Sequence, residues 1–302
     1  MVERRTAGER FDCEAFQHQL NTRFFGREAH LLYRPVVDST NALALQLACE
    51  GSAEGVVVVT DSQVAGRGRL GRRWVDLAGH NVLSSTIVRP LFPTYLLVML
   101  ASLAVVDAIA ATCDLRALLK WPNDVLLAER KVAGILIETA HDLQGRLVAI
   151  LGIGVNVNGR GEAYTLKSGS GTLRPAEPVS GATYTSPVLP ATTLESECGY
   201  QVSRERFLAR MLERIEDLYL ALQEEARQRS EAPGAPPSAS RLIRERWRTS
   251  LSTLGRAVEV DQGGTRVSGI AEDVDERGEL LLRLHSGKLV SITWGDVGHS
   301  AR

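Results

Sequence analysis

The sequence has no excess of charge of either sign. Its 302 residues include 35 lysines and arginines against 36 aspartates and glutamates, which leaves a formal net charge of −1 at neutral pH. A chain without an overall positive charge has no general electrostatic attraction to nucleic acid or to an anionic membrane. We therefore expect neither DNA nor a membrane as a partner, unless a local patch of charge provides the attraction.

The sequence is also poor in residues that hold metals or form covalent intermediates. Its four cysteines lie far apart, and the absence of a C-x-x-C pair excludes a zinc knuckle and a dithiol motif. The six histidines are scattered without an H-E-x-x-H pattern, and no G-x-S-x-G nucleophile elbow is present. Free thiols in a chain of this size are typical of a reducing compartment, so we expect a cytoplasmic protein.

No apolar run is long enough to indicate a transmembrane helix. The most apolar run, residues 96–111, contains Ser102 and Asp107 and falls short of the ~20 residues needed to cross a bilayer. It is more typical of a helix buried in a protein core. The first ten residues, MVERRTAGER, lead into no apolar segment, so we expect no secretory signal.

What is present indicates a folded chain of two parts. Apolar residues make up 44%, which is ordinary for a globular protein. Strand and helix patterns over residues 1–250 predict a mixed β-sheet with packed helices, an α+β fold. Short strands and glycine-containing turns over residues 251–302 predict a small β-barrel. Residues 159–190, rich in Gly, Ser, Thr and Pro, are expected to form a mobile surface insertion.

The expected elements follow from hydrophobic periodicity and turn residues. Helices are expected within residues 11–32 and at 42–48, 96–112, 207–222 and 240–250. Strands are expected at 56–60, 82–88, 118–121, 124–127, 131–138, 147–156, 257–260, 265–270, 279–284 and 289–294.

The strongest chemical signal is the sequence GRGRLGRRW at residues 66–74. Its glycines let the backbone approach a ligand closely, and its four arginines offer planar forks suited to carboxylate and phosphate oxygens. Its spacing matches neither the P-loop nor the dinucleotide-binding fingerprint. The pattern therefore favours a polyphosphate site about as much as a solvated basic turn or a local RNA-binding patch. Its like charges repel, so we expect the loop to be mobile until an anion binds.

A second signal is KWPND at residues 120–124, followed by KVAGILIE at 131–138. If Lys131 points inward, its charge must be matched by a ligand anion or by a carboxylate, for which Asp124 and Glu138 are the candidates. Asp124 is also suited to help hold Mg²⁺. For Lys131 taken alone, an exposed hairpin end is the more common outcome.

Two further segments carry polar side chains at structured positions. GIGVNVN at residues 152–158 places asparagines in a buried strand, where they need hydrogen-bond partners. DSTN at residues 38–41 precedes an apolar helical run and has the composition of a helix cap. Each segment could serve the fold alone or bind a polar ligand group.

Together, these five segments resemble biotin protein ligases, and they occur in the order found in that family. The resemblance covers nearly the whole chain except residues 159–190. It implies a catalytic domain like those of biotin ligases and class II aminoacyl-tRNA synthetases, followed by an SH3-like domain. It also implies biotin and ATP as substrates with Mg²⁺, activation of biotin as biotinyl-5′-AMP, and transfer to a lysine of a biotin carboxyl carrier protein of a carboxylase. Only 37 residues precede Asp38, too few for the DNA-binding domain of repressor forms, so we expect no repressor function.

The resemblance also assigns site residues. It implies catalytic roles for Lys131, Arg67 and Arg69. It implies biotin binding by Ser39, Thr40, Asn41, Gln63, Arg67, Gly68, Arg69, Trp74, Lys131 and Gly134. It implies ATP binding by Arg69, Arg72, Lys120, Asn123, Asp124 and Asn156, with Asp124 the candidate for Mg²⁺.

Two alternatives stay open from the sequence. A lipoate-type protein ligase shares the adenylation chemistry, but its usual R-R-x-x-G-G-G-x-V segment is absent and GRGRLGRRW stands in its place. A non-catalytic biotin- or nucleotide-binding protein would bind without turning over ATP. The sequence is compatible with a monomer or a homodimer, and it identifies neither the acceptor protein, nor the adenine contacts, nor the role of the C-terminal barrel.

Overall fold

The computed structural model describes residues 8–161, 164, 189–232, 234 and 236–299. Its larger sheet has seven strands in the order β1-β2-β3-β7-β6-β5-β4. β1 and β2 are parallel and the other neighbouring pairs are antiparallel, so the sheet is mixed, as the sequence predicts. The strands are β1 (Leu31–Val37), β2 (Val57–Gln63), β3 (Asn81–Val88), β4 (Leu118–Lys120), β5 (Asp124–Leu127), β6 (Arg130–His141) and β7 (Leu147–Asn156).

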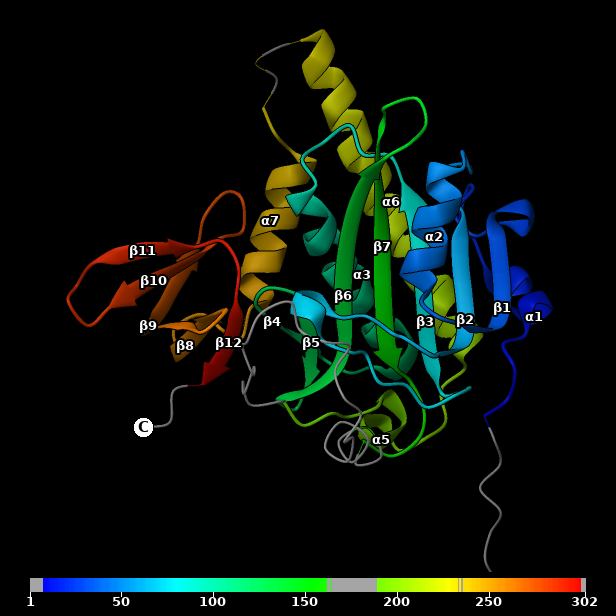
Figure 1. Ribbon diagram of the computed structural model, residues 1–302, viewed down its shortest axis with the longest axis horizontal. Coiled ribbons are helices and arrows are strands. Elements are labelled where there is room, and N and C mark those ends of the chain that lie inside the picture. The colour runs from blue at the N-terminus through cyan, green and yellow to red at the C-terminus, as the bar shows by residue number, and fades with distance from the viewer. Residues whose placement is uncertain (1–7, 162–163, 165–188, 233, 235, 300–302) are drawn as a thin grey trace, which may run out of the picture.

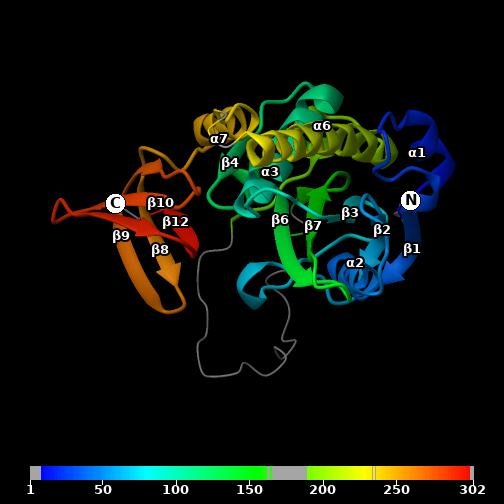
Figure 2. The same cartoon turned by 90° about the horizontal axis from the view of Figure 1, so that it is seen from above.

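Helices cover both faces of this sheet (Figures 1 and 2). On one face, α2 (Thr40–Cys49) packs against β2, β3, β6 and β7. On the other face lies α3 (Tyr95–Cys113), against which α6 (Arg204–Glu231) and α7 (Ala239–Ser250) pack. Two further α-helices are α1 (Cys13–Gln19), which contacts α6, and the short α5 (Leu194–Cys198), which contacts α3.

The apolar helix α3 is a core helix. Its length and composition would allow it to cross a membrane, but 67% of its apolar window is buried inside the protein. It is enclosed by the sheet, α6 and α7. A helix that is hydrophobic on every side is stable in a protein when its neighbours cover every side. The interpretation of residues 96–111 as a buried helix is therefore confirmed.

The beginning of α2 is fixed by a cap and by close packing on the sheet. Ser39 is the N-cap residue, and its hydroxyl accepts a hydrogen bond from the Ala42 amide at 3.4 Å. The small side chains of Ala44 and Ala48 are fully buried, which lets the helix approach the sheet closely. The cap interpretation of residues 38–41 is thus confirmed, and the capped end of the helix lies beside the strands that build the pocket described below.

The C-terminal residues form a separate antiparallel sheet in the order β11-β10-β9-β8-β12. In the part of the chain that the structure describes, no ladder joins β11 to β12 to close the sheet by hydrogen bonds. The sheet still has the short strands and tight turns expected of a small SH3-like domain. Its strands are β8 (Ala257–Gln262), β9 (Thr265–Val274), β10 (Leu280–Leu284), β11 (Leu289–Ile292) and β12 (Asp296–His299).

The KWPND segment connects the two sheets. Trp121 is 2% exposed, its amide donates to Thr253 Oγ1 at 2.9 Å, and its indole Nε1 donates to the Gly278 carbonyl at 2.8 Å. The Ser252 amide donates to the Leu119 carbonyl at 2.7 Å. The C-terminal sheet is therefore hydrogen-bonded directly to the segment that carries Lys120 and Asp124.

Two strands are absent from the sequence prediction. Residues 31–37, for which the pattern predicts no strand, form the edge strand β1. Three consecutive exposed residues, Pro35 among them, remove the alternation typical of a half-buried strand. β12 is missed because the pattern of four residues is too short to read. Residues 162–163 and 165–188 of the expected insertion lie outside the described residues.

Candidate functional site

Every site residue that the sequence analysis selects lines one pocket, a cavity of about 770 Å³. This volume lies in the range of small-molecule sites. All five motif segments contribute to its wall, although they come from α2, the residue 66–74 loop, β5, β6 and β7. The C-terminal sheet contributes Asp296 and Val297. The sheet order brings β6 and β7 between β3 and β5, and this explains why segments far apart in sequence meet here.

One end of the pocket has a floor of hydroxyl and amide groups, which the Glu138 carboxylate supports. The Thr40 amide donates to Gln63 Oε1 at 2.8 Å. Ser85 Oγ lies 2.8 Å from Thr40 Oγ1 and 2.6 Å from Asn41 Oδ1. Asn41 Nδ2 donates to Glu138 Oε2 at 2.8 Å. Ser85 escapes the sequence analysis because a single serine in a buried strand carries no pattern of its own.

The glycines of GIGVNVN make room for the side chains that shape this floor. A Cβ on Gly152 would lie 2.0 Å from Asn41 Oδ1, and a Cβ on Gly154 would lie 2.6 Å from Trp74 Cε2. Trp74 therefore rests directly on the backbone of β7, and its Nε1 is buried without a hydrogen-bond partner among the described residues. Lys131 Nζ lies 5.6 Å from the centre of the Trp74 ring, within cation–π range. Trp74 thus forms an apolar wall between the polar floor and the charged end.

The arginine loop is held as a compact turn above the pocket. The Gly68 amide donates to the Arg72 carbonyl at 2.7 Å, and the Trp74 amide donates to the Gly66 carbonyl at 2.9 Å. Leu70 has a φ of 55°, in the left-handed region. These bonds order the loop in this structure, and its mobility without an anion stays a prediction.

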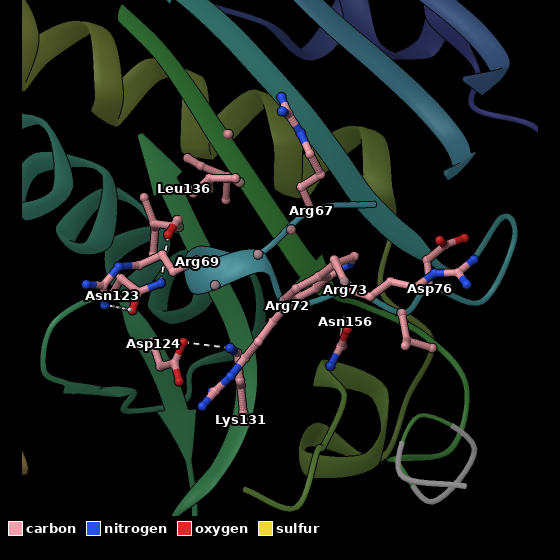
Figure 3. A pocket seen from close by; sticks show the side chains of 18 of the residues that line it. Arg67, Arg69, Arg72, Arg73, Asp76, Asn123, Asp124, Lys131, Leu136 and Asn156 are labelled. Atoms are coloured by element: carbon pink, nitrogen blue, oxygen red, sulfur yellow. Dashed lines mark hydrogen bonds and ion pairs between the residues drawn. The ribbon is translucent and has the colours of Figure 1, made fainter. Parts of the chain in front are cut away.

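Four cations of the pocket each contact a side-chain oxygen of the protein. Arg67 pairs with Glu138 at 2.8 Å, and Lys131 pairs with Asp124 at 2.6 Å. Arg69 donates to Asn123 Oδ1 at 3.2 Å, and Arg72 pairs with Asp296. Figure 3 shows Arg69 directed toward Asn123 and Arg67 pointing away from Asn123. Of the two carboxylates that the sequence offers as partners of Lys131, the structure selects Asp124, and Glu138 instead accepts from Arg67 and Asn41.

Burial changes the titration of two basic groups at the charged end. It lowers the pKa of Lys120, an effect that Asp124 opposes and Lys131 reinforces. It also lowers the pKa of Arg69, which Asp296 and Asp124 oppose. A partly buried cation is poorly solvated, so an anionic ligand that replaces the lost water is bound more strongly than it would be in the open.

Asn156 is satisfied by the protein. Its Nδ2 donates to the Thr192 carbonyl at 3.1 Å, and its Oδ1 accepts from Asn81 Nδ2 at 3.1 Å. Asn158 similarly binds Val202 through both its amide groups. These bonds give the asparagines of GIGVNVN a structural role, and the contact of Asn156 with ATP stays a prediction. Asn81, 1% exposed, is a further pocket-supporting residue that the sequence analysis does not select.

The described side chains of the pocket do not by themselves form a complete metal site. Among the residues that the structure describes, no group of three or more His, Cys, Asp or Glu side chains could hold a metal ion. Mg²⁺ in nucleotide sites is usually bound by one or two carboxylates together with substrate phosphates and water. The pocket fits that mode, because Asp124 lies at the cationic end and is 18% exposed.

Comparison with known proteins decides the family. Residues 33–158 match the biotin/lipoate A/B protein ligase family, and residues 253–300 match the biotin protein ligase C-terminal domain. The biotin–[acetyl-CoA-carboxylase] ligase of Paracoccus denitrificans is 34% identical over 258 residues, which cover 84% of this chain and 94% of that protein. The chain belongs to the biotin protein ligase family. All the selected site residues of this chain lie inside the matched segment 33–158.

Two other relatives show how far the likeness extends. The bifunctional ligase/repressor BirA of Bacillus spizizenii is 39% identical over 148 residues, which cover 48% of this chain and 45% of that protein. The solved structure of biotin protein ligase from Aquifex aeolicus in complex with biotin and ATP superposes with a TM-score of 0.64 at 26% identity. The likeness covers 89% of this chain and 97% of the Aquifex chain, so it includes both sheets.

Proposed function

We propose that this chain is an ATP-dependent biotin protein ligase of the biotin–[acetyl-CoA-carboxylase] type. It activates biotin as biotinyl-5′-AMP, releases diphosphate, and transfers biotin to a lysine of a biotin carboxyl carrier domain. The observation that carries the proposal is the division of one pocket into a floor of hydroxyl and amide groups and an end with several cations. The two ends are suited to the two ends of the biotin molecule, a polar ring and a carboxylate.

At the polar end, the chain would bind the biotin ring. Ser39, Thr40, Asn41 and Gln63 provide hydroxyl and amide groups, which can donate to and accept from a ureido ring. Trp74 and Gly134 would flank the apolar tail, because the indole covers the backbone of β6 and β7. Arg67, Gly68, Arg69 and Lys131 would then meet the carboxylate.

At the charged end, the chain would bring two anions together. An oxygen of the biotin carboxylate attacks the α-phosphorus of ATP, the bond from that phosphorus to the bridging oxygen breaks, and diphosphate leaves. Catalysis of such a step is mainly positioning and charge neutralisation. Lys131, Arg67 and Arg69 are the groups we assign to it. A protein nucleophile is not needed, because the lysine amine of the acceptor attacks the mixed anhydride, expels AMP and loses its proton.

The phosphate side of the pocket would bind ATP. Arg69, Arg72, Lys120, Asn123, Asp124 and Asn156 are the residues that we assign to ATP. Mg²⁺ neutralises phosphate charge when it is bound, and Asp124 is the carboxylate that we propose as its ligand. Release of Asp124 from Lys131 would leave the ammonium group available to the carboxylate and phosphate oxygens.

The rest of the proposal concerns the whole protein. We take residues 1–250 as the catalytic domain and residues 251–302 as the C-terminal SH3-like domain, supported by the separate family matches of the two parts. The acceptor is a biotin carboxyl carrier protein, which requires an exposed lysine. The protein works in the cytoplasm, as a monomer or as a homodimer.

ATP–diphosphate exchange tests the proposal. The assay is run with Mg²⁺ and with biotin, with lipoate, or with neither acid. We expect exchange with biotin alone, followed by labelling of a carrier domain. Exchange with lipoate would move the chain to the lipoate-type ligases. Measurable biotin binding without exchange would show a binding protein and remove the roles assigned to Lys131 and Arg67.

A further inference from the structure

Asp296 is a carboxylate that the C-terminal sheet places in the pocket of the catalytic domain. It begins β12, where it is paired with Asp261 of β8, and its side chain is 18% exposed. The preceding Gly295 has a φ of 143°, and a Cβ there would lie 2.6 Å from Val260 Cγ1 and 2.9 Å from the Asp261 carbonyl oxygen. The turn therefore admits only glycine, and the ladder holds Asp296 at one position relative to the pocket.

The surroundings of Asp296 are cationic. Its carboxylate forms an ion pair with Arg72 of the arginine loop. Its charge also raises the pKa of Lys120 and of Arg69, against the larger lowering effect of burial on each. In Figure 3 the Arg72 side chain runs toward the end of the pocket that holds Lys131 and Asp124. Asp296 is thus, beside Asp124, a negative charge that acts on the cations we assign to the phosphates of ATP.

The attachment of the C-terminal sheet does not depend on this ion pair. Trp121 bonds to Thr253 and to Gly278, and Ser252 bonds to Leu119, and none of these bonds involves Arg72. Arg248 of α7 also binds Asp273 of β9, with Nη2 2.8 Å from Oδ2. Since other contacts hold the two parts together, the Arg72–Asp296 pair is free to open when a stronger anion arrives.

We propose that Asp296 is a positioning residue that stands in for a phosphate on Arg72. A carboxylate and a phosphate bind the same donor edge of a guanidinium group, so the two exclude each other there. Asp296 holds Arg72 at the pocket before the triphosphate binds, yields it to the phosphate oxygens, and recovers it when diphosphate leaves. The inference rests on the proposed function, because it requires ATP as substrate and diphosphate as product.

The role proposed for Asp296 has two effects that can be measured, one on ATP and one on diphosphate. Competition from Asp296 weakens the binding of ATP, and the same competition weakens the retention of diphosphate. Removing the charge while keeping the shape, in Asp296→Asn, should therefore lower both the KM for ATP and the inhibition constant of diphosphate by about two- to fivefold, the range of a partly exposed ion pair. The KM for biotin should not change, because Asp296 lies at the phosphate end.

The matched control is Asp273→Asn. Asp273 belongs to the same small sheet, pairs with an arginine of the catalytic domain, and does not line the pocket. It should leave all three constants unchanged. In an Arg72→Gln background, Asp296→Asn should lose most of its effect, since the competition acts through Arg72.

Several results would overturn the inference. A KM for ATP that rises or stays constant in Asp296→Asn would show that the residue is not a competitor. If Asp296→Asn lowers the KM for ATP equally in the Arg72→Gln background, Asp296 does not act through Arg72. Biotin-dependent adenylation by the unmodified protein separates this inference from the proposed function: its absence defeats the function, and its presence with an unaffected Asp296→Asn variant defeats only the role of Asp296.

Discussion

Gly152 of β7 lies directly against the side chain of Asn41 at the start of α2. A Cβ on Gly152 would lie 2.0 Å from Asn41 Oδ1 and 2.6 Å from its Cγ, closer than any packing can accept. The Asn41 amide is in turn bonded to Ser85, Glu138 and the Leu136 carbonyl, and it is 4% exposed. The absence of a side chain at residue 152 therefore determines where the polar floor of the pocket lies.

Substitution of Gly152 by alanine should damage biotin binding selectively. The added methyl group must displace Asn41, and overpacking of this kind typically costs about 1–3 kcal/mol. We expect the KM for biotin to rise about tenfold or more in Gly152→Ala, while the KM for ATP changes little. Steady-state adenylation kinetics measure both constants, and circular dichroism checks the fold. A normal KM for biotin in a folded variant would contradict the placement of the biotin ring at Asn41.

Lys131→Ala should abolish adenylation and leave the fold intact. Lys131 is partly exposed and pairs with Asp124, which is itself in contact with solvent, so the loss leaves no deeply buried charge. Its removal takes away a positive charge from the place where negative charge develops, and we expect biotin-dependent exchange to fall roughly 100-fold or more. The control is Arg130→Ala, the neighbouring cation, which pairs with Glu197 and does not line the pocket. Comparable rates in the two variants would remove the role of Lys131.

Arg67→Gly should weaken the retention of biotinyl-AMP. Arg67 contacts Glu138 in this structure, and its side chain is 42% exposed, so it can turn toward an anion at little cost. Loss of one charge-assisted contact should speed dissociation of the adenylate about tenfold. Stopped-flow release of the isolated intermediate gives the rate. Arg73→Gly, in the same loop, is the comparison, because Arg73 binds the Val64 carbonyl and points toward Asp76 (Figure 3). Equal release from both variants would argue that the loop, and not Arg67, retains the adenylate.

At alkaline pH, kcat/KM for ATP should begin to fall at a lower pH than it would if Lys120 had the pKa of an ordinary lysine. Burial lowers the pKa of Lys120 below its usual 10.5, with Asp124 and Asp296 opposing and Lys131 and Arg72 reinforcing the effect. As pH rises through this lowered pKa, the ammonium loses its proton and its attraction for phosphate. We therefore expect kcat/KM for ATP to fall at a pH below 10.5, and kcat/KM reports groups of the free enzyme.

The variant Lys120→Arg should move this alkaline decrease to higher pH, because a guanidinium group stays charged throughout the range. Lys288→Arg, an exposed lysine in the turn between β10 and β11, is the control and should leave the profile unchanged. If the profiles of all three proteins coincide, Lys120 does not contribute its charge to ATP binding.

Local sequence patterns were sufficient for much of the fold. The strand Leu147–Asn156 has the bounds that its continuous apolar run predicts, and the helix over residues 96–112 is extended by only one residue at each end. The reason is that burial repeats along a helix or strand with a fixed period, and that period is visible in the sequence. Edge strand β1 and the four residues of β12 lack such a period, so the sequence pattern predicts neither strand.

The order of five motif segments identified the family resemblance, because each segment alone has a structural alternative and the five together are specific. The resemblance then assigned the site residues, and all of them line the pocket. Their partners depended on the folded chain. The choice of Asp124 over Glu138 for Lys131, the support of Asn41 by Ser85, and the ion pair between Arg72 and Asp296 all follow from strand order and domain placement. Hydrophobic periodicity does not specify which strands become neighbours, so contacts between residues more than 200 positions apart emerge only when the sheets are assembled.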